Sequence, residues 1–211
     1  MEIKFIDECS STHLCLIDAL KQGEIVVPVA LCAKSQTNGV GSRGNSWQSL
    51  AGGLFLSMAV DKNSLPKDLP MVSIAIYFAM VIKQILSSHG SLVWVKWPND
   101  LYVNDKKVGG LISTFVGDYC VISVGINLCL APNDASSLDI DMDADLLALK
   151  ICGSFDFLPS WGDIFTLFKA EFEKSRAFCS HAKSRVYDLS CAELLNDGSL
   201  KIGDERIYSL R

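Results

Sequence analysis

Hydrophobic residues occur along the chain in short alternating or continuous stretches, which is the pattern of β-strands. Most of these stretches are bounded by glycine, proline, asparagine or aspartate, residues that favour turns. The strand-like stretches are residues 3–6, 24–33, 54–60, 92–96, 101–103, 106–116 and 119–130. The last four follow one another with only turns between them. They predict a meander within an antiparallel or mixed sheet.

Other segments repeat their hydrophobic residues with a helical period. A first helix is predicted after a cap at Ser11 or Thr12, with its end at Gly23. The apolar run over 71–82 is shorter than the roughly 20 residues that cross a bilayer, so it predicts a buried core helix. A last helix carries a hydrophobic stripe formed by Trp161, Ile164, Phe165, Phe168 and Phe172. Strands and helices together predict an α+β fold.

The end of the chain differs from the rest. Residues 131–145 are acidic and predict a loop, whereas short β-like pieces occupy 185–211 around Asn-Asp-Gly and Gly-Asp turns. We therefore expect a main domain over residues 1–182 and a small β domain over 183–211.

Composition narrows the class of protein. The chain has 211 residues, 49% hydrophobic and 20% charged, which is typical of a globular protein. Its net charge of −5 argues against a broad nucleic-acid-binding surface. Its 8 cysteines include no C-x-x-C pair, which argues against a zinc finger or ribbon, and most lie in apolar runs. The first residues lack the apolar stretch of a signal peptide, so we expect free thiols in a reducing, cytoplasmic setting.

A glycine-rich polar loop over residues 35–49 is the first candidate for chemistry. Gly39, Gly41 and Gly44 give the string G-x-G-x-x-G, and glycine lets successive N–H groups turn toward one anion. Arg43 adds a positive charge, and Trp47 offers a flat face for a ring. A strand rather than a helix follows, which excludes a Rossmann site, and no Gly-Lys-Ser/Thr is present for a Walker loop. A mobile surface loop remains the alternative.

A second candidate is the string Lys-Trp-Pro-Asn-Asp-Leu over 96–101, which is followed by Lys107. A hairpin between them would bring Asp100 and Lys107 into one cleft. Gly109 and Gly110 weaken the strand and often mark the close approach of a ligand. A tight turn with an exposed salt bridge is the alternative, and such a bridge contributes little stability.

Isolated polar residues give weaker signals. Asn127 lies within an apolar strand, where asparagine is uncommon, so it must either satisfy nearby backbone groups or face a ligand. His13, His89 and His181 have no serine or carboxylate partner at a telling spacing. A hydrolytic triad is not supported, and we expect surface or capping roles for these histidines.

Together these strings resemble the biotin protein ligases. The matching pieces, in order, are Ser11-Thr12, Gln36-Thr37, the loop 39–47, the string 96–101, Lys107-Val108-Gly109-Gly110-Leu111 and Gly125-Ile126-Asn127. The string 96–101 with its downstream lysine is the most specific of them. The resemblance implies a catalytic domain like that of class II aminoacyl-tRNA synthetases, followed by a small SH3-like β domain.

The resemblance also implies a two-step reaction. Biotin and ATP give biotinoyl-5'-AMP and pyrophosphate, with Mg²⁺ holding the pyrophosphate, and a lysine of a biotin carboxyl carrier protein then displaces AMP. Lys107 and Arg43 would stabilise the meeting anions, and Asp100 would orient or receive the proton of the acceptor lysine. The implied biotin-binding residues are Ser11, Thr12, Gln36, Gly39, Val40, Gly41, Ser42, Lys107 and Gly110. The implied nucleotide-binding residues are Arg43, Trp47, Asn99 and Asn127.

The sequence departs from the family pattern at several positions. Val40, Ser42 and Asn45 stand where the family loop usually carries arginines, so Arg43 alone remains. His13 replaces a common asparagine, and Ser123 replaces a frequent glycine. The poorer loop charge predicts a high biotin KM or appreciable escape of the adenylate.

Two other functions are also compatible with the sequence. One alternative is a ligase or transferase acting on lipoate or octanoate, and another is a non-catalytic sensor of biotin or adenylate. The chain begins near the catalytic motifs, so we expect a ligase without a DNA-binding domain. We expect no DNA or membrane partner, and a monomer or homodimer.

Overall fold

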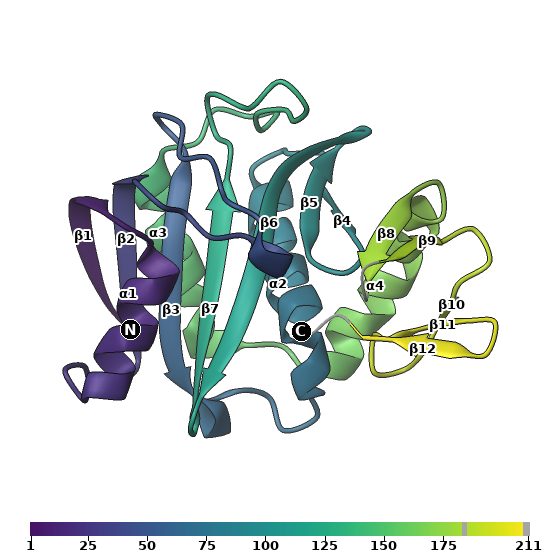
Figure 1. Ribbon diagram of the computed structural model, residues 1–211, viewed down its shortest axis with the longest axis horizontal. Helices are drawn as coiled ribbons and strands as arrows, with labels where there is room; N and C mark the ends of the chain where they lie inside the picture. Colours follow the sequence, from purple (N-terminus) through teal and green to yellow (C-terminus); the bar gives the residue numbers. More distant parts are fainter. Residues whose placement is uncertain (183–184, 209–211) are drawn as a thin grey trace.

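The computed structural model describes residues 1–182 and 185–208 of the chain. A mixed 7-stranded sheet with the order β1-β2-β3-β7-β6-β5-β4 forms its centre (Figure 1). β1 and β2 are parallel, and every other neighbouring pair in this sheet is antiparallel. The strands are β1 (Glu2–Cys9), β2 (Val29–Gln36), β3 (Leu54–Asp61), β4 (Trp94–Lys96), β5 (Asp100–Val103), β6 (Lys106–Val116) and β7 (Tyr119–Ile126). The predicted α+β class and the meander are confirmed.

Helices cover both faces of the sheet. One face carries α1, which contacts β2, β3, β6 and β7, while α2 and α3 pack on the other face and α4 packs beside α2 and β4. Short 3₁₀ turns precede α2 and follow α3, at Met71–Ser73 and Ser154–Phe157. The helices are α1 (Thr12–Gln22), α2 (Ile74–Ser88), α3 (Ala144–Gly153) and α4 (Trp161–Ser175).

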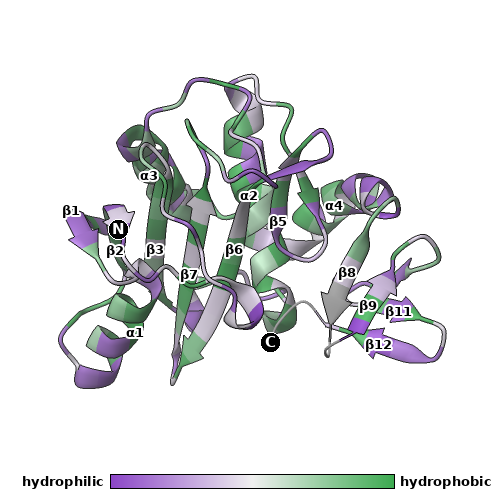
Figure 2. Cartoon of the chain, turned by 45° about the horizontal axis from the view of Figure 1, so that its top comes forward, coloured by the Kyte–Doolittle hydropathy of each residue, from purple (hydrophilic) through white to green (hydrophobic). Residues whose placement is uncertain are grey.

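The alternation of side chains along β3 explains why the two faces differ. Leu54, Leu56 and Met58 point into the large core under α2, α3 and α4, where they are completely buried. On the opposite face Ala59 packs with α1, but the position before it on that face is Ser57, which is also completely buried. Figure 2 shows the hydrophobic stretches gathered in the central strands and the hydrophilic colour along β1 and the C-terminal strands. The α1 face thus combines a small apolar cluster with buried polar groups.

The predicted helix ends follow from their caps. Ser11 caps α1 by accepting a hydrogen bond from Leu14 N, and Gly23 ends the helix in the left-handed region at φ 69°. The apolar segment Met71–Ser88 is long and apolar enough to span a membrane. In this fold it is a core helix, because Ile74 through Ile82 are all buried.

Several expectations about element bounds were wrong. The strand expected over 119–130 ends at Ile126, and the strand expected over 92–96 begins at Trp94. β2 begins only at Val29, later than predicted, because Pro28 has no N–H for the ladder and Val26 before it is 88% exposed. The loop expected over 131–145 ends two residues early, at Asp143, whose side chain caps the unpredicted helix α3. The stripe of α4 is confirmed, since all of its residues are buried.

The predicted small C-terminal β region is present. It consists of a hairpin, β8 (Cys179–Ala182) with β9 (Arg185–Asp188), and a 3-stranded sheet of β10 (Glu193–Leu194), β11 (Leu200–Ile202) and β12 (Glu205–Ile207). The domain boundary expected after residue 182 lies between the paired strands of that hairpin.

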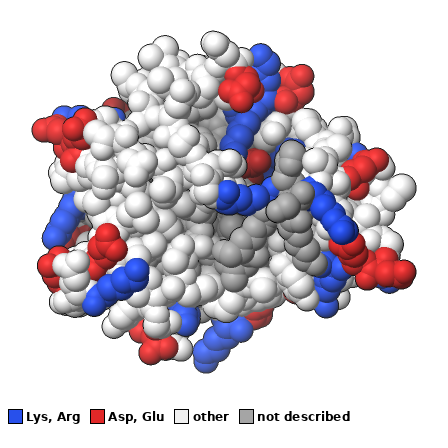
Figure 3. Space-filling view, viewed as in Figure 1, with Lys and Arg blue, Asp and Glu red and all other residues white. Residues whose placement is uncertain are grey.

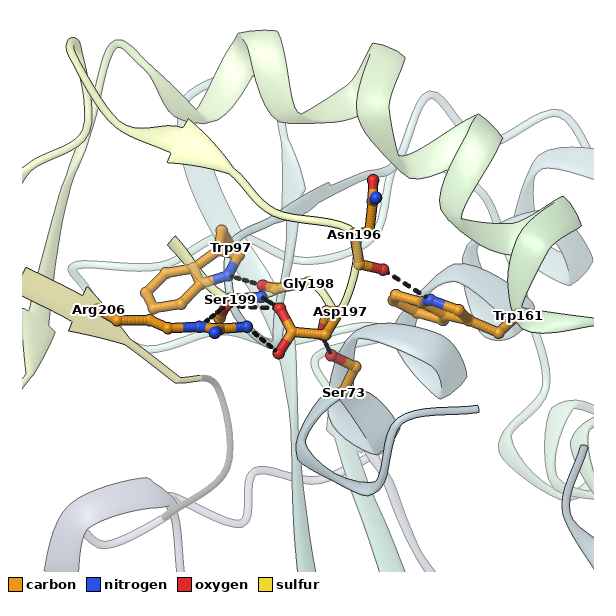
Figure 4. A network of polar contacts seen from close by, with 8 residues as sticks. All are labelled: Ser73, Trp97, Trp161, Asn196, Asp197, Gly198, Ser199 and Arg206. Carbon is orange, nitrogen blue, oxygen red and sulfur yellow. Dashed lines mark hydrogen bonds and ion pairs between the residues drawn. The ribbon is translucent and has the colours of Figure 1, made fainter. Parts of the chain in front are cut away.

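The turn before β11 joins this region to the main domain. We call residues 196–199, with the side chains that hold them, the C-terminal anchor (Figure 4). The Trp97 indole N–H donates to Gly198 O at 2.9 Å, and the Trp161 indole N–H donates to Asn196 O at 3.0 Å. Ser73 donates to Asp197 O. Leu189, Ala192, Leu200 and Ile207 extend the same large core.

All eight cysteines are free thiols, as the sequence predicts. On the face shown in Figure 3, basic and acidic side chains are interspersed, with some basic side chains near the centre of the view.

Candidate active site

A cavity lies between the N-terminus of α1, the loop after β2, and the strands β6 and β7. Its volume is ≈ 40 Å³. Of the predicted biotin-binding residues, all but Gly39 line it. Its lining residues from that prediction are Ser11, Thr12, Gln36, Val40, Gly41, Ser42, Lys107 and Gly110.

Asp100 and Lys107 meet at the wall of this cavity. The Lys107 ammonium lies 2.6 Å from Asp100 Oδ1, and the two side chains are 36% and 19% exposed. The prediction that the β5–β6 hairpin brings them into one cleft is confirmed. Gly110 pairs with Asp100 across the hairpin, and a Cβ there would lie 3.2 Å from both charged groups. The glycine therefore leaves room for the ion pair.

The Asp100 carboxylate lies among positively charged side chains. Lys96 is its partner across β4 and β5, and its ammonium lies 5.4 Å from the Tyr102 ring. Burial lowers the pKa of Lys96, an effect that the Asp100 charge opposes. Burial also lowers the pKa of Arg43, again opposed by Asp100. The site thus gathers several positive charges around one carboxylate.

The glycine-rich loop closes over the cavity, and in Figure 1 it passes in dark blue in front of β7 and β6. It is held by its own backbone, through Trp47 N to Gly39 O at 2.8 Å and Gly41 N to Asn45 O at 2.7 Å. A Cβ at Gly39 would lie 2.7 Å from Trp47 O, so this glycine serves the loop rather than the cavity wall. Arg43 adopts the left-handed region at φ 63° within a 3₁₀ turn.

Trp47 lies across the sheet. Its ring rests on Gly125, where a Cβ would come within 2.5 Å of the indole, and the Lys107 ammonium is 5.9 Å from the ring. The Trp47 indole N–H is buried and has no hydrogen-bond partner within the described residues. A buried donor without a partner is costly, which is consistent with a polar ligand at this position.

The end of the cavity away from Lys107 is polar. His13 is buried, its Nδ1 lies 2.7 Å from Ser123 Oγ, and its Nε2 lies 2.9 Å from Thr114 Oγ1. Burial lowers the pKa of His13 to about 4, so the ring is neutral at neutral pH. The expectation of a surface or capping role was therefore wrong for His13.

The other histidines differ from His13. His89 is exposed and caps α2, with its Nδ1 2.9 Å from Ile85 O, which confirms the expected capping role. The His181 side chain lies outside the described residues.

The predicted nucleotide-binding residues do not share one cavity. Trp47 and Asn99 both line the ≈ 40 Å³ cavity. Trp47 and Asn127 also line a cavity of ≈ 460 Å³ beside Lys107, and Arg43 and Asn99 line one of ≈ 360 Å³. The side-chain amides of Asn99 and Asn127 also donate hydrogen bonds to backbone carbonyls. Asn127 donates to Ser136 O at 3.3 Å, and Asn99 donates to Leu111 O.

Sequence reasoning missed part of the polar end. Ser57 and Thr114 were not singled out, although a serine inside the apolar run 54–60 was a visible signal. Among the described residues, no group of three or more His, Cys, Asp or Glu side chains could hold a metal ion. The residues present therefore do not form a metal site of their own.

The model of the biotin/lipoate A/B protein ligase family matches residues 5–128 of the chain. The bifunctional ligase/repressor BirA of Escherichia coli is 33% identical over 127 residues, which are 57% of this chain and 38% of that protein. BirA of Salmonella typhimurium is 30% identical over 158 residues, 67% of this chain and 48% of that protein. The chain therefore spans less than half the length of these two relatives.

A solved structure matches over almost the full length. Biotin acetyl coenzyme A carboxylase synthetase from Helicobacter pylori, crystallised with bound biotinylated ATP, superimposes with a TM-score of 0.93 and 34% identity. The match covers 98% of this chain and 99% of that chain, so the small C-terminal β region is included. With the family model covering more than half of the chain, these matches show that the chain belongs to the biotin/lipoate A/B protein ligase family, and within it to the biotin protein ligases.

Proposed function

We propose that the protein is an ATP-dependent biotin protein ligase, which activates biotin as biotinoyl-5'-AMP and transfers it to a lysine of a biotin carboxyl carrier protein. The observation that carries the proposal is the Asp100–Lys107 pair at 2.6 Å on the wall of a cavity with a polar end. A carboxylic acid with a polar ring would fit there with its carboxylate toward Lys107.

In the first step a carboxylate oxygen of biotin forms a bond to the α-phosphorus of ATP, and pyrophosphate leaves. Two anions must approach, so positive charge placed in advance lowers the barrier. Lys107 is our candidate to bridge the carboxylate and the α-phosphate oxygens, with Arg43 and the loop N–H groups beside it. An incoming carboxylate would compete with Asp100 for the ammonium.

In the second step the nitrogen of the acceptor lysine attacks the acyl carbon, and AMP leaves. The acceptor arrives as an ammonium and must lose a proton before it can attack. Asp100 is our candidate for this proton, since its carboxylate would be released once Lys107 binds the phosphate.

ATP brings its own metal requirement. We propose Mg²⁺ as the companion of ATP, held mainly by phosphate oxygens, because the described residues offer no cluster of acids for it. No step of the proposal depends on a protein-bound metal.

We propose that the glycine-rich loop opens to admit substrates, because it closes over the cavity and Trp47, which lies on Gly125, forms part of the cavity wall. Val40, Ser42 and Asn45 supply no cations, so we propose that the closed loop retains the adenylate weakly. Trapping experiments in which the intermediate stays bound over many turnovers would refute this.

The test of the proposed function is ATP-dependent transfer of labelled biotin to a carrier domain, with pyrophosphate release measured separately. We expect Lys107→Ala to slow adenylate formation about 10²–10³-fold, as the loss of one oxyanion donor does elsewhere. The matched control is Lys106→Ala, which removes the exposed lysine next to it in β6. Equal loss in both variants, or full activity in Lys107→Ala, would contradict the assignment.

Two alternatives are separated by the same assay. A lipoate or octanoate ligase would use those acids in preference to biotin. A sensor would bind biotin and ATP without releasing pyrophosphate. We further propose a cytoplasmic location, a carboxylase carrier domain as partner, no DNA or membrane partner, and a monomer or homodimer.

A further inference from the structure

A continuous chain of hydrogen bonds runs beneath the polar end of the cavity. It connects side chains from β6, α1, β7, β3 and β2, and we call it the pocket chain. Its contacts are Thr114 Oγ1 to His13 Nε2 at 2.9 Å, His13 Nδ1 to Ser123 Oγ at 2.7 Å, Ser123 Oγ to Ser57 Oγ at 2.6 Å, Ser57 Oγ to Thr12 Oγ1 at 2.8 Å and Thr12 Oγ1 to Gln36 Oε1 at 3.2 Å.

One backbone N–H group fixes which atom donates and which accepts in each hydrogen bond of the pocket chain. The Thr12 N–H donates to Gln36 at 2.9 Å, so the Gln36 atom there is its oxygen. That oxygen can only accept, so the Thr12 hydroxyl also donates to it. The Thr12 proton is then used, and Ser57 must donate to Thr12.

The same reasoning continues to the histidine. With its proton used on Thr12, Ser57 must accept from Ser123. Ser123 must then accept from His13, which therefore carries its proton on Nδ1. In the neutral ring, His13 Nε2 then accepts from the Thr114 hydroxyl. Burial lowers the pKa of His13 to about 4, which keeps this ring neutral at neutral pH.

The ordered chain determines what the cavity offers a ligand. Thr12 can accept from a ligand but has no proton to donate. The Gln36 amide nitrogen lies toward the loop at Gly39 with its two N–H groups, and the Ser11 hydroxyl can donate. One acceptor beside two donors complements a ring that carries N–H next to C=O, as a cyclic urea does. A dithiolane ring would leave the Thr12 acceptor and the Gln36 and Ser11 donors without partners. Unpaired polar groups of this kind allow a site to discriminate strongly against a ligand that lacks hydrogen-bonding groups.

We infer that His13, Ser123 and Ser57 are positioning residues that hold Thr12 and Gln36 ready for a cyclic-urea ring and so select it against an apolar ring. The inference rests on the proposed function and adds the groups that set its selectivity. His13 and Ser123, two positions at which the sequence departs from the family pattern, form one directly bonded unit. Ser57 does not line the cavity, so it can affect a ligand only through the chain.

The test measures biotin and lipoate binding by calorimetry in wild type, Ser57→Ala, His13→Phe and the double variant. We expect each single change to weaken biotin binding about tenfold, the effect of losing one good hydrogen bond. Because both act through one chain, the double variant should lose about tenfold rather than a hundredfold. Lipoate binding, the KM for ATP and the rate of transfer from bound adenylate should change less than twofold.

A matched control is Ser91→Ala, which removes a buried serine bonded to Asp139 at 2.5 Å on the far side of the sheet. It should lower the melting temperature without changing biotin binding. If His13→Phe does not fold, Ser57→Ala, which removes a single oxygen, decides the question. Unchanged biotin binding in a folded Ser57→Ala overturns the inference while leaving the ligase proposal intact. A wild type that binds no biotin overturns both.

Discussion

Two hydrogen-bonded networks join distant parts of this chain, and they are built from different donors. The C-terminal anchor is held by two donors of fixed direction, the indole N–H groups of Trp97 and Trp161, and by the hydroxyl of Ser73, all directed at carbonyls of a turn. The pocket chain uses hydroxyls that can rotate and a histidine that can change its tautomer. Fixed donors suit a contact that must stay in place. Rotatable donors suit a site whose hydrogen bonds must accommodate a ligand.

Charge separates the two networks further. The anchor includes Arg206 and Asp197, whose side chains are 47% and 26% exposed. The side chains of the pocket chain are neutral, and Thr12, His13, Ser57 and Ser123 are all buried. Charge at the anchor is solvated, whereas an unpaired charge in the pocket would be expensive. The networks should therefore respond differently to truncation, to pH and to salt.

The largest expected effect is at Trp97. Its side chain is 1% exposed and packs in the large core, so Trp97→Ala should cost about 3–5 kcal/mol of unfolding free energy. Trp97→Phe keeps much of the ring and loses the bond to Gly198 O, which should cost about 1–3 kcal/mol. Urea denaturation of the two variants separates packing from hydrogen bonding. Equal losses would mean that the indole N–H contributes nothing to the anchor.

The next effect concerns pH and the pocket chain. His13 takes up a proton near pH 6.5 when unfolded but only near pH 4 when folded. The unfolded state therefore binds more protons between these pH values. As the pH falls from about 6.5 toward 4, the protein loses the part of its unfolding free energy that comes from keeping His13 neutral. The loss should reach about 3 kcal/mol at pH 4.

The measurement is the difference between wild type and His13→Phe in denaturant melts at several pH values. Acidic groups titrate in both proteins, so they cancel in the comparison. The variant should lose less stability on acidification than wild type. Parallel curves would show that the folded protein accepts a charged His13, against the lowered pKa that its burial implies.

The two networks also differ in how far the sequence could predict them. The strand over 106–116 and the meeting of Asp100 and Lys107 follow from local turns, so the sequence was sufficient for both. His13 and Ser123 are 110 positions apart, and their contact forms only when α1 has packed on the folded sheet. The sequence around either residue gives no indication that the two are in contact.

The C-terminal anchor could not be predicted from the sequence for the same reason. Trp97 and its acceptor Gly198 are 101 positions apart. The Asn-Asp-Gly turn was visible in the sequence, but its docking on two tryptophans depends on where α4 places Trp161. Periodicity thus predicts elements and nearby pairs, whereas networks that cross the sheet depend on the assembled core.

The smallest expected effect is at Arg206. Its guanidinium lies 2.6 Å from Asp197 Oδ2 and donates to Ser199 Oγ at 2.9 Å, but nearly half of the side chain is exposed. Burial raises the pKa of Asp197, yet hydrogen bonds from Ser199 and the Arg206 charge outweigh it and lower the pKa below its usual value. The stability from Asp197 is therefore present at neutral pH and lost as the pH falls through its folded pKa.

Arg206→Ala should cost at most about 1 kcal/mol at neutral pH, less in high salt, because water and ions screen an exposed pair. Asp197 keeps its hydrogen bonds from Ser199, so no buried charge is left unpaired. Arg206→Lys, which retains the charge, should recover part of the loss. Biotin affinity should not change in either variant, in contrast to the pocket-chain variants. A biotin affinity that fell severalfold in Arg206→Ala would show that the anchor and the pocket act as one network, and the division argued from their donors would fail.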